Sequence, residues 1–79
     1  MAENPVVEKL AALARAGTPA DEIAIPIYKR RRVYLFKIFG RRKLLAEVEI
    51  RVTDVEDLWR IEREVYDYLI AQKQRLRPK

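Results

Sequence analysis

The sequence predicts a single small α+β domain in which two helices flank an antiparallel hairpin or three-stranded sheet. Residues 33–39 and 44–52 are rich in β-branched and aromatic residues, and a short Gly-Arg-Arg segment separates them. Apolar residues recur at helical spacing over residues 5–16 and again over a longer run from about residue 54. This order of elements fits one domain over residues 1–79.

The first helix is predicted over residues 5–16. Asn4 is a preferred helix N-cap, and Pro5 is tolerated at the first helical position. Gly17 then suits the C-terminal cap, because glycine adopts the left-handed conformation there at little cost. One apolar face follows from the spacing of Val6, Leu10, Leu13 and Ala14.

Residues 18–28 leave two alternatives open. Thr18 and Asp21 resemble a second helix start, which favours a short turn of helix followed by extended chain. The alternative is a short strand over residues 23–28. Pro26 cannot donate a backbone hydrogen bond, so such a strand belongs at the edge of the sheet.

The hairpin is predicted with a loop of about three residues, Gly-Arg-Arg at 40–42, which sets Ile38 near Leu44 and Phe36 near Ala46. One face of the second strand then carries Leu44, Ala46, Val48, Ile50 and Val52. Tyr34 and Phe36 share this apolar face. They are therefore candidates both for the core and for a binding surface.

The second helix is predicted to begin at about residue 54, after a capping box of Thr53 and Glu56, and to continue toward Arg75. The tail, residues 75–79, is expected to fray. The main apolar stripe is Leu58, Ile61, Val65, Leu69 and Leu76. A second stripe is Val55, Trp59, Tyr66 and Ile70. Since covering one sheet needs a single stripe, the second predicts a homo-oligomer interface, unless the first helix covers it.

The composition argues against the common catalytic and metal sites. The chain has no Cys, His or Ser, so the usual ligands of zinc and iron and the usual nucleophiles are missing. Glu47 and Glu49 stand at strand spacing and are interpreted as a solvated face. We therefore expect no catalytic residues, no metal, no cofactor and no small-molecule substrate.

Two further expectations follow from composition. No apolar run has the length of a membrane span, and the N-terminus lacks an apolar signal core, so the sequence predicts a cytoplasmic protein. Abundant Arg, Lys and Glu with scarce Asn, Gln and Met are typical of a thermophilic source.

The net charge of +5 is concentrated in the middle of the chain. Residues 23–52 carry nine Lys or Arg and two Glu, whereas the two flanking segments are acidic or neutral. Such clustering is expected of a protein that binds a polyanion. Two basic clusters, residues 29–32 and residues 41–43, lie roughly 20–25 Å apart along the hairpin, with aromatic residues between them. The predicted nucleic-acid-binding residues are Lys29, Arg30, Arg31, Arg32, Tyr34, Phe36, Lys37, Arg41, Arg42 and Lys43.

Interleaved charge and aromatic residues favour single strands, because bases stack on aromatic faces without regard to sequence. The sequence thus predicts a non-catalytic, sequence-tolerant binder of single-stranded DNA or RNA. Two alternatives stay open. One is a protein-interaction subunit of a larger ribonucleoprotein complex, which docks a partner through Trp59, Tyr66 and Ile70. The other is a double-stranded-RNA-binding module.

The order helix, strands, helix resembles the double-stranded-RNA-binding domain, and residues 39–47, Phe-Gly-Arg-Arg-Lys-Leu-Leu-Ala-Glu, are similar to the second hairpin of that family. The family contacts RNA with a Lys-rich start of its second helix. Here that position reads Thr-Asp-Val-Glu-Asp at 53–57, which would repel phosphate.

Residues 23–70 also resemble the archaeal single-stranded-DNA-binding family called ThermoDBP and its shorter relatives. That resemblance implies a cleft of apolar and aromatic residues flanked by basic ones, with assembly through helices. The flanks would be the runs 29–32 and 41–43, and the lining would be Tyr28, Tyr34, Phe36 and Trp59.

Overall fold

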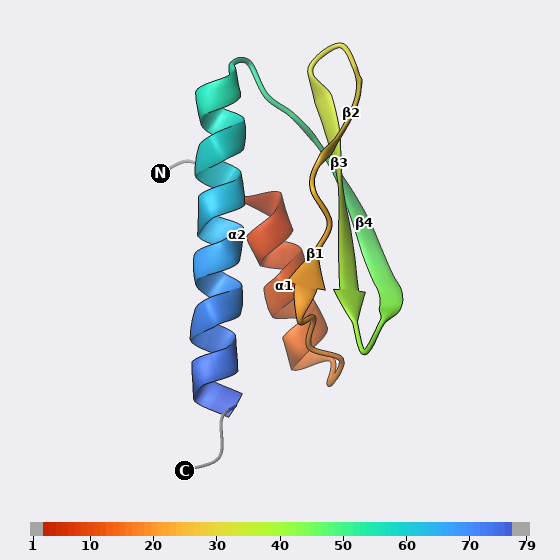
Figure 1. Cartoon of the computed structure of the whole chain (residues 1–79), viewed down its shortest axis with the longest axis vertical. Coiled ribbons are helices and arrows are strands. Elements are labelled where there is room, and N and C mark those ends of the chain that lie inside the picture. Colours follow the sequence, from red (N-terminus) through yellow and green to blue (C-terminus); the bar gives the residue numbers. More distant parts are fainter. Residues whose placement is uncertain (1–2, 77–79) are drawn as a thin grey trace.

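The computed structural model describes residues 3–76 as two layers, with both helices on one face of a sheet (Figure 1). In chain order the elements are α1 (Pro5–Arg15), β1 (Glu22–Ile23), β2 (Ile27–Arg30), β3 (Val33–Gly40), β4 (Lys43–Arg51) and α2 (Val55–Leu76). The predicted α+β class is confirmed. Of the predicted tail, residues 75–76 are helical and residues 77–79 lie outside the described part of the chain. Neither helix is long and apolar enough, over the described residues, to cross a membrane.

β3 is the central strand of the antiparallel sheet. β4 pairs along one side of it, while β1 and β2 pair along the other as two pieces of one edge strand. Pro26 lies in the gap between the two pieces. The helical turn favoured for residues 18–28 is therefore wrong, and the edge strand is correct. The backbone N–H groups of Asp21 and Ala24 bind carbonyl oxygens of β3, which holds this segment extended.

The hairpin differs from its predicted register by two residues. Its loop has two residues, not three, because Gly40 pairs with Lys43. A register irregularity follows at once, so that Ile38 lies opposite Ala46 and not opposite Leu44. The extra residue turns Leu45 toward the core and leaves Leu44 half-exposed, the reverse of the prediction. A shift of two residues preserves the faces of all residues beyond the bulge.

One cluster of buried side chains joins the sheet to both helices. Phe36 and Ile38 of β3 are fully buried at its centre. Around them pack Val6, Leu10, Ile50, Val52, Leu58, Ile61, Val65 and Leu69. The main stripe of α2 is thus confirmed up to Leu69, whereas the Leu76 side chain lies outside the description. Since α1 packs against this main stripe, the alternative in which it covers the second stripe is wrong.

The helix ends follow local capping chemistry. Asn4 accepts hydrogen bonds from the N–H groups of Val6 and Val7, as expected of an N-cap. Gly17, at φ 85°, closes α1 in a Schellman motif. The start of α2 corrects the prediction. Asp54 is the cap, since its carboxylate accepts from the N–H of Asp57 at 3.0 Å, and no capping box of Thr53 and Glu56 forms within the described residues.

Asn4 also ties α1 to α2. Its Nδ2 donates to the Ile61 carbonyl oxygen at 3.2 Å and to Glu64 Oε1 at 2.8 Å. The hydrogen bond from Asn4 to Glu64, together with the Arg60 guanidinium, holds the pKa of Glu64 below its ordinary value against the opposing effect of burial. A lowered carboxyl pKa stabilises the fold above the pKa of the unfolded chain. That contribution is lost as the pH falls through the lower pKa of the folded protein.

Replacing Asn4 should therefore cost more than one helix cap. We expect Asn4→Ala to lower the free energy of unfolding by about 2 kcal/mol, because the cap and the links to α2 are both lost. Asn4→Ser keeps a capping oxygen but cannot reach α2, so it should lose about half as much. Urea titration measures both values. The difference in free energy of unfolding between wild type and Asn4→Ala should become smaller in acid, because protonation of Glu64 weakens its bond to Asn4. Equal losses for the two variants would contradict the link to α2.

Candidate nucleic-acid interface

The two tight turns of the sheet have the same sequence and the same backbone conformation. Arg31 and Arg32 join β2 to β3, and Arg41 and Arg42 join β3 to β4. All four have positive φ, between 54° and 65°. Positive φ at both central residues is the pattern of a type I′ turn, which suits the twist of a two-residue hairpin. The usual residues there are Asn and Gly, not Arg.

Arginine at these positions carries a backbone cost. A side chain with a Cβ loses roughly 1–2 kcal/mol in the left-handed region, and these turns place two such residues in succession. Backbone strain of this kind is concentrated at functional sites, where the side chain is needed for another reason. The reason available here is charge, because each turn presents two guanidinium groups at an end of the sheet.

The β2–β3 turn (Arg31–Arg32) gathers five positive charges. Lys29 and Arg30 precede it, and the register places Arg30 and Arg51 on either side of Val33. These residues are exposed, and none of them forms an ion pair within residues 3–76. Arg51 was missed by the sequence analysis, because only the pairing of β4 with β3 brings it to this end of the sheet.

Two tyrosines lie beside this turn. Tyr34 alternates with Val33 and faces the helices, as do the core residues of β3, and Tyr28 lies directly opposite it. Their rings pack edge to face, with ring centroids 5.3 Å apart. Figure 1 shows α1 alongside the other half of the sheet, toward the β3–β4 turn (Arg41–Arg42). Tyr34 is half-buried, while Tyr28 is 57% exposed, so an aromatic surface remains open at the same end of the sheet as the five cations, on the face opposite to that of Val33, Arg30 and Arg51.

The remaining predicted residues do not form one continuous track. Phe36 is 0% exposed, so its prediction as a base-binding residue is wrong for this fold. Lys37 is half-buried on the face away from the helices, opposite Glu47. Glu49 lies on the same face, opposite Leu35. These two carboxylates lie between the basic clusters, which β3 holds roughly 25 Å apart.

The β3–β4 turn is less strongly positive than the β2–β3 turn. Arg41 and Arg42 line a surface depression together with Lys73 and with the acidic Asp21 and Glu22. The Asp21 carboxylate also accepts a hydrogen bond from the backbone N–H of Arg41 at 3.2 Å. Carboxylates beside the two arginines repel an approaching phosphate. Arg51, at the other end, likewise lines a depression with Glu3, Glu49 and Asp57. The β3–β4 end is the weaker candidate anion site because it gathers fewer cations than the β2–β3 turn.

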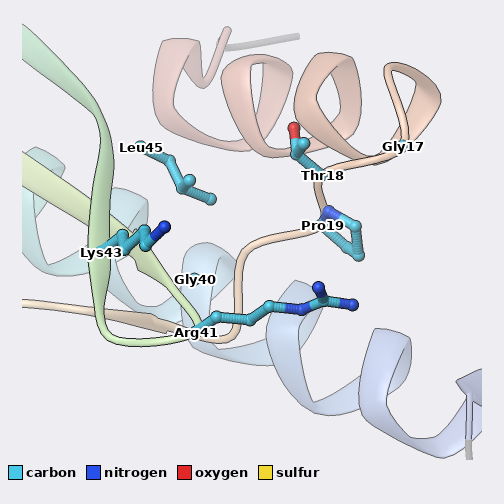
Figure 2. Close-up of a pocket in the computed structure, with 7 residues that line it drawn as sticks. All are labelled: Gly17, Thr18, Pro19, Gly40, Arg41, Lys43 and Leu45. Carbon is cyan, nitrogen blue, oxygen red and sulfur yellow. The ribbon is translucent and has the colours of Figure 1, made fainter.

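A small hollow of about 200 Å³ lies behind the β3–β4 turn. Figure 2 shows Lys43 and Leu45 pointing from β4 toward the loop that carries Thr18 and Pro19. Gly40 lines the hollow, and a Cβ there would lie 2.7 Å from Leu45 Cδ1 and 3.0 Å from the Pro19 carbonyl oxygen, so a larger residue would displace the Leu45 side chain and press on the loop. Its volume is below the roughly 300 Å³ at which pockets begin to enclose a typical ligand.

The backbone cost of the arginine turns can be measured. Replacing Arg31 and Arg32 by Asn and Gly should raise the free energy of unfolding by about 1–2 kcal/mol, because these residues tolerate positive φ. Thermal and urea unfolding give the value. The double variant Arg31→Ala with Arg32→Ala removes the same charges but keeps the backbone cost. If the alanine pair stabilises as much as the Asn-Gly pair, the gain comes from relieved charge repulsion and not from the backbone.

Comparisons of the chain with protein-family models, with curated proteins and with solved structures found no match. The resemblances to the ThermoDBP proteins and to the double-stranded-RNA-binding domain therefore stay predictions. The candidate interface consists of the five cations at the β2–β3 turn and the tyrosine pair at the same end of the sheet.

Proposed function

We propose that this protein binds nucleic acid without catalysis and with little regard to sequence, and that it prefers single strands. The β2–β3 turn is the main contact. Its cations neutralise backbone phosphates, and Tyr28 provides a face on which a base stacks. The β3–β4 turn supplies a second, weaker contact with phosphate. The observation that carries the proposal is the combination, at one end of the sheet, of an exposed tyrosine and five cations that form no ion pair with residues 3–76.

The arrangement of these groups favours a backbone-led mode of binding. Electrostatic contacts with phosphate carry most of the affinity of sequence-tolerant binders, and each contact releases counterions. The five cations flank the turn on both edges of β3, so they can follow a chain that bends around it. Tyr34 contacts the ring of Tyr28 edge to face, which leaves Tyr28 more than half exposed.

The start of α2 supports the preference for single strands. Figure 1 shows this helix beginning at the same end of the molecule as the β2–β3 turn. Its first turn and cap carry three carboxylates, on Asp54, Glu56 and Asp57. A duplex is wide enough to bring further phosphates toward these acidic groups. A single strand can contact the turn and avoid them, and only unpaired bases can stack on Tyr28.

Titrations with a labelled single strand and with its duplex, at several salt concentrations, test the proposal. The wild type should bind the single strand more tightly at every salt concentration. Replacing Arg31 and Arg32 by Asn and Gly should reduce the slope of log affinity against log salt by about 1.4, since each lost single-strand phosphate contact is worth about 0.7. Tyr28→Ala should weaken single-strand binding by about 1–3 kcal/mol.

The chain offers a matched control for each change. The same Asn-Gly replacement at Arg41 and Arg42 removes equal charge from the weaker turn, so it should reduce affinity less. Ile25→Ala removes another exposed apolar side chain, away from both arginine turns and from α2, and should leave binding unchanged. Tighter binding of the duplex would reject the preference for single strands and favour the double-stranded-RNA alternative. No binding to either form at low salt would reject the function.

A further inference from the structure

The second stripe of α2 is fully formed and uncovered. Val55, Trp59, Tyr66 and Ile70 are between 43% and 58% exposed, although they are large and apolar. They lie on one side of the helix, beside the buried stripe that faces α1 and the sheet. From Val55 to Ile70 the stripe is roughly 22 Å long, at 1.5 Å per residue. Soluble monomers rarely expose a continuous apolar surface of this extent, so such a surface usually marks an interaction site.

The area of the stripe is sufficient for a modest interface between two copies. Large aromatic side chains bury about 150–250 Å² each, so Trp59 and Tyr66 at their observed exposure, together with the smaller Val55 and Ile70, offer on the order of 400 Å² per copy. Two copies then contribute on the order of 800 Å² before the neighbouring side chains are counted. A stable interface needs about 1,000 Å² in total, which the stems of Glu62, Arg63 and Lys73 bring within reach.

The charges beside the stripe indicate what covers it. With about 100° between successive residues, Glu62 lies about 50° to one side of the stripe and Arg63 about 50° to the other, both at its midpoint. Glu62 is half-buried on the side toward the core, and Arg63 is exposed on the side toward solvent. Neither forms an ion pair within the part of the chain that the structure describes.

These two charges distinguish the two ways in which a two-fold axis can pair the helices. In an antiparallel pair, each flank meets the same flank of the partner, so Glu62 faces Glu62 of the second copy and Arg63 faces Arg63. In a parallel pair, each flank meets the opposite flank, so Glu62 of each copy faces Arg63 of the other. Flanking charges set orientation in helix pairs in this way. The parallel arrangement therefore has two attractive contacts where the antiparallel one has two repulsive contacts.

We infer that two copies of this chain form a symmetric dimer through parallel pairing of their α2 stripes, with Trp59 and Tyr66 at the centre and reciprocal Glu62–Arg63 pairs at the sides. A two-fold axis parallel to α2 keeps like ends together. Both β2–β3 turns then lie at the same end of the dimer, since each turn is at the end where α2 begins. The interface itself does not depend on the proposed function.

Sedimentation equilibrium over concentrations from micromolar to tens of micromolar tests the inference. The wild type should have the mass of a dimer at the upper end, and Trp59→Glu should be monomeric with an unchanged circular dichroism spectrum, because Trp59 is outside the core. Glu62→Arg and Arg63→Glu should each weaken dimerisation about tenfold, since each turns two attractive contacts into two repulsive ones. The double variant, Glu62→Arg with Arg63→Glu, should restore the dimer to within about threefold.

Lys9→Glu makes the same change in net charge as Arg63→Glu but lies on α1, so it should leave the dimer unchanged. A wild type that stays monomeric across the range would overturn the inference. So would single charge reversals that leave the dissociation constant unchanged, or a double variant as weak as either single one. None of these outcomes bears on the affinity of the β2–β3 turn for nucleic acid, which the salt titrations measure separately.

Discussion

The pairing of β3 along both of its sides constrains the rest of the molecule. Strand side chains alternate between the two faces, so Tyr34, Phe36 and Ile38 must all point toward the helices. A chain of 79 residues can build one small core, and these side chains supply its centre. The aromatic residues of β3 are therefore largely committed to stability. The basic side chains lie in the turns at the two ends of β3, because side chains there do not pack into the core.

The parts of the fold with a strong repeating pattern were predictable from the sequence. The alternation over β3 and the helical spacing of Leu58, Ile61 and Val65 each point to one buried face. The predictions that were wrong concern neighbouring residues with the same apolar character. Leu44 and Leu45 are both apolar, so alternation alone cannot tell which one the bulge turns inward.

The candidate site was predictable only where its residues are adjacent in the chain. The basic runs are visible as runs, whereas Arg51 joins the β2–β3 turn through strand pairing with a residue far away in the sequence. Tyr28 and Phe36 are both aromatic residues near basic ones, yet one is open and the other is buried. What separates them is their place in the sheet, since Phe36 lies on the central strand β3 and Tyr28 on the edge strand β2, and no local pattern states that strand order.

The central claim is that a single strand contacts the β2–β3 turn and Tyr28. Amide chemical shifts of the ¹⁵N-labelled protein, followed while a short single strand is added, test it most directly because they locate the contact residue by residue. The largest changes should fall on residues 28–33 and on Arg51, with smaller changes at residues 41–43. Changes confined to the exposed stripe of α2, or spread evenly over the molecule, would contradict the claim.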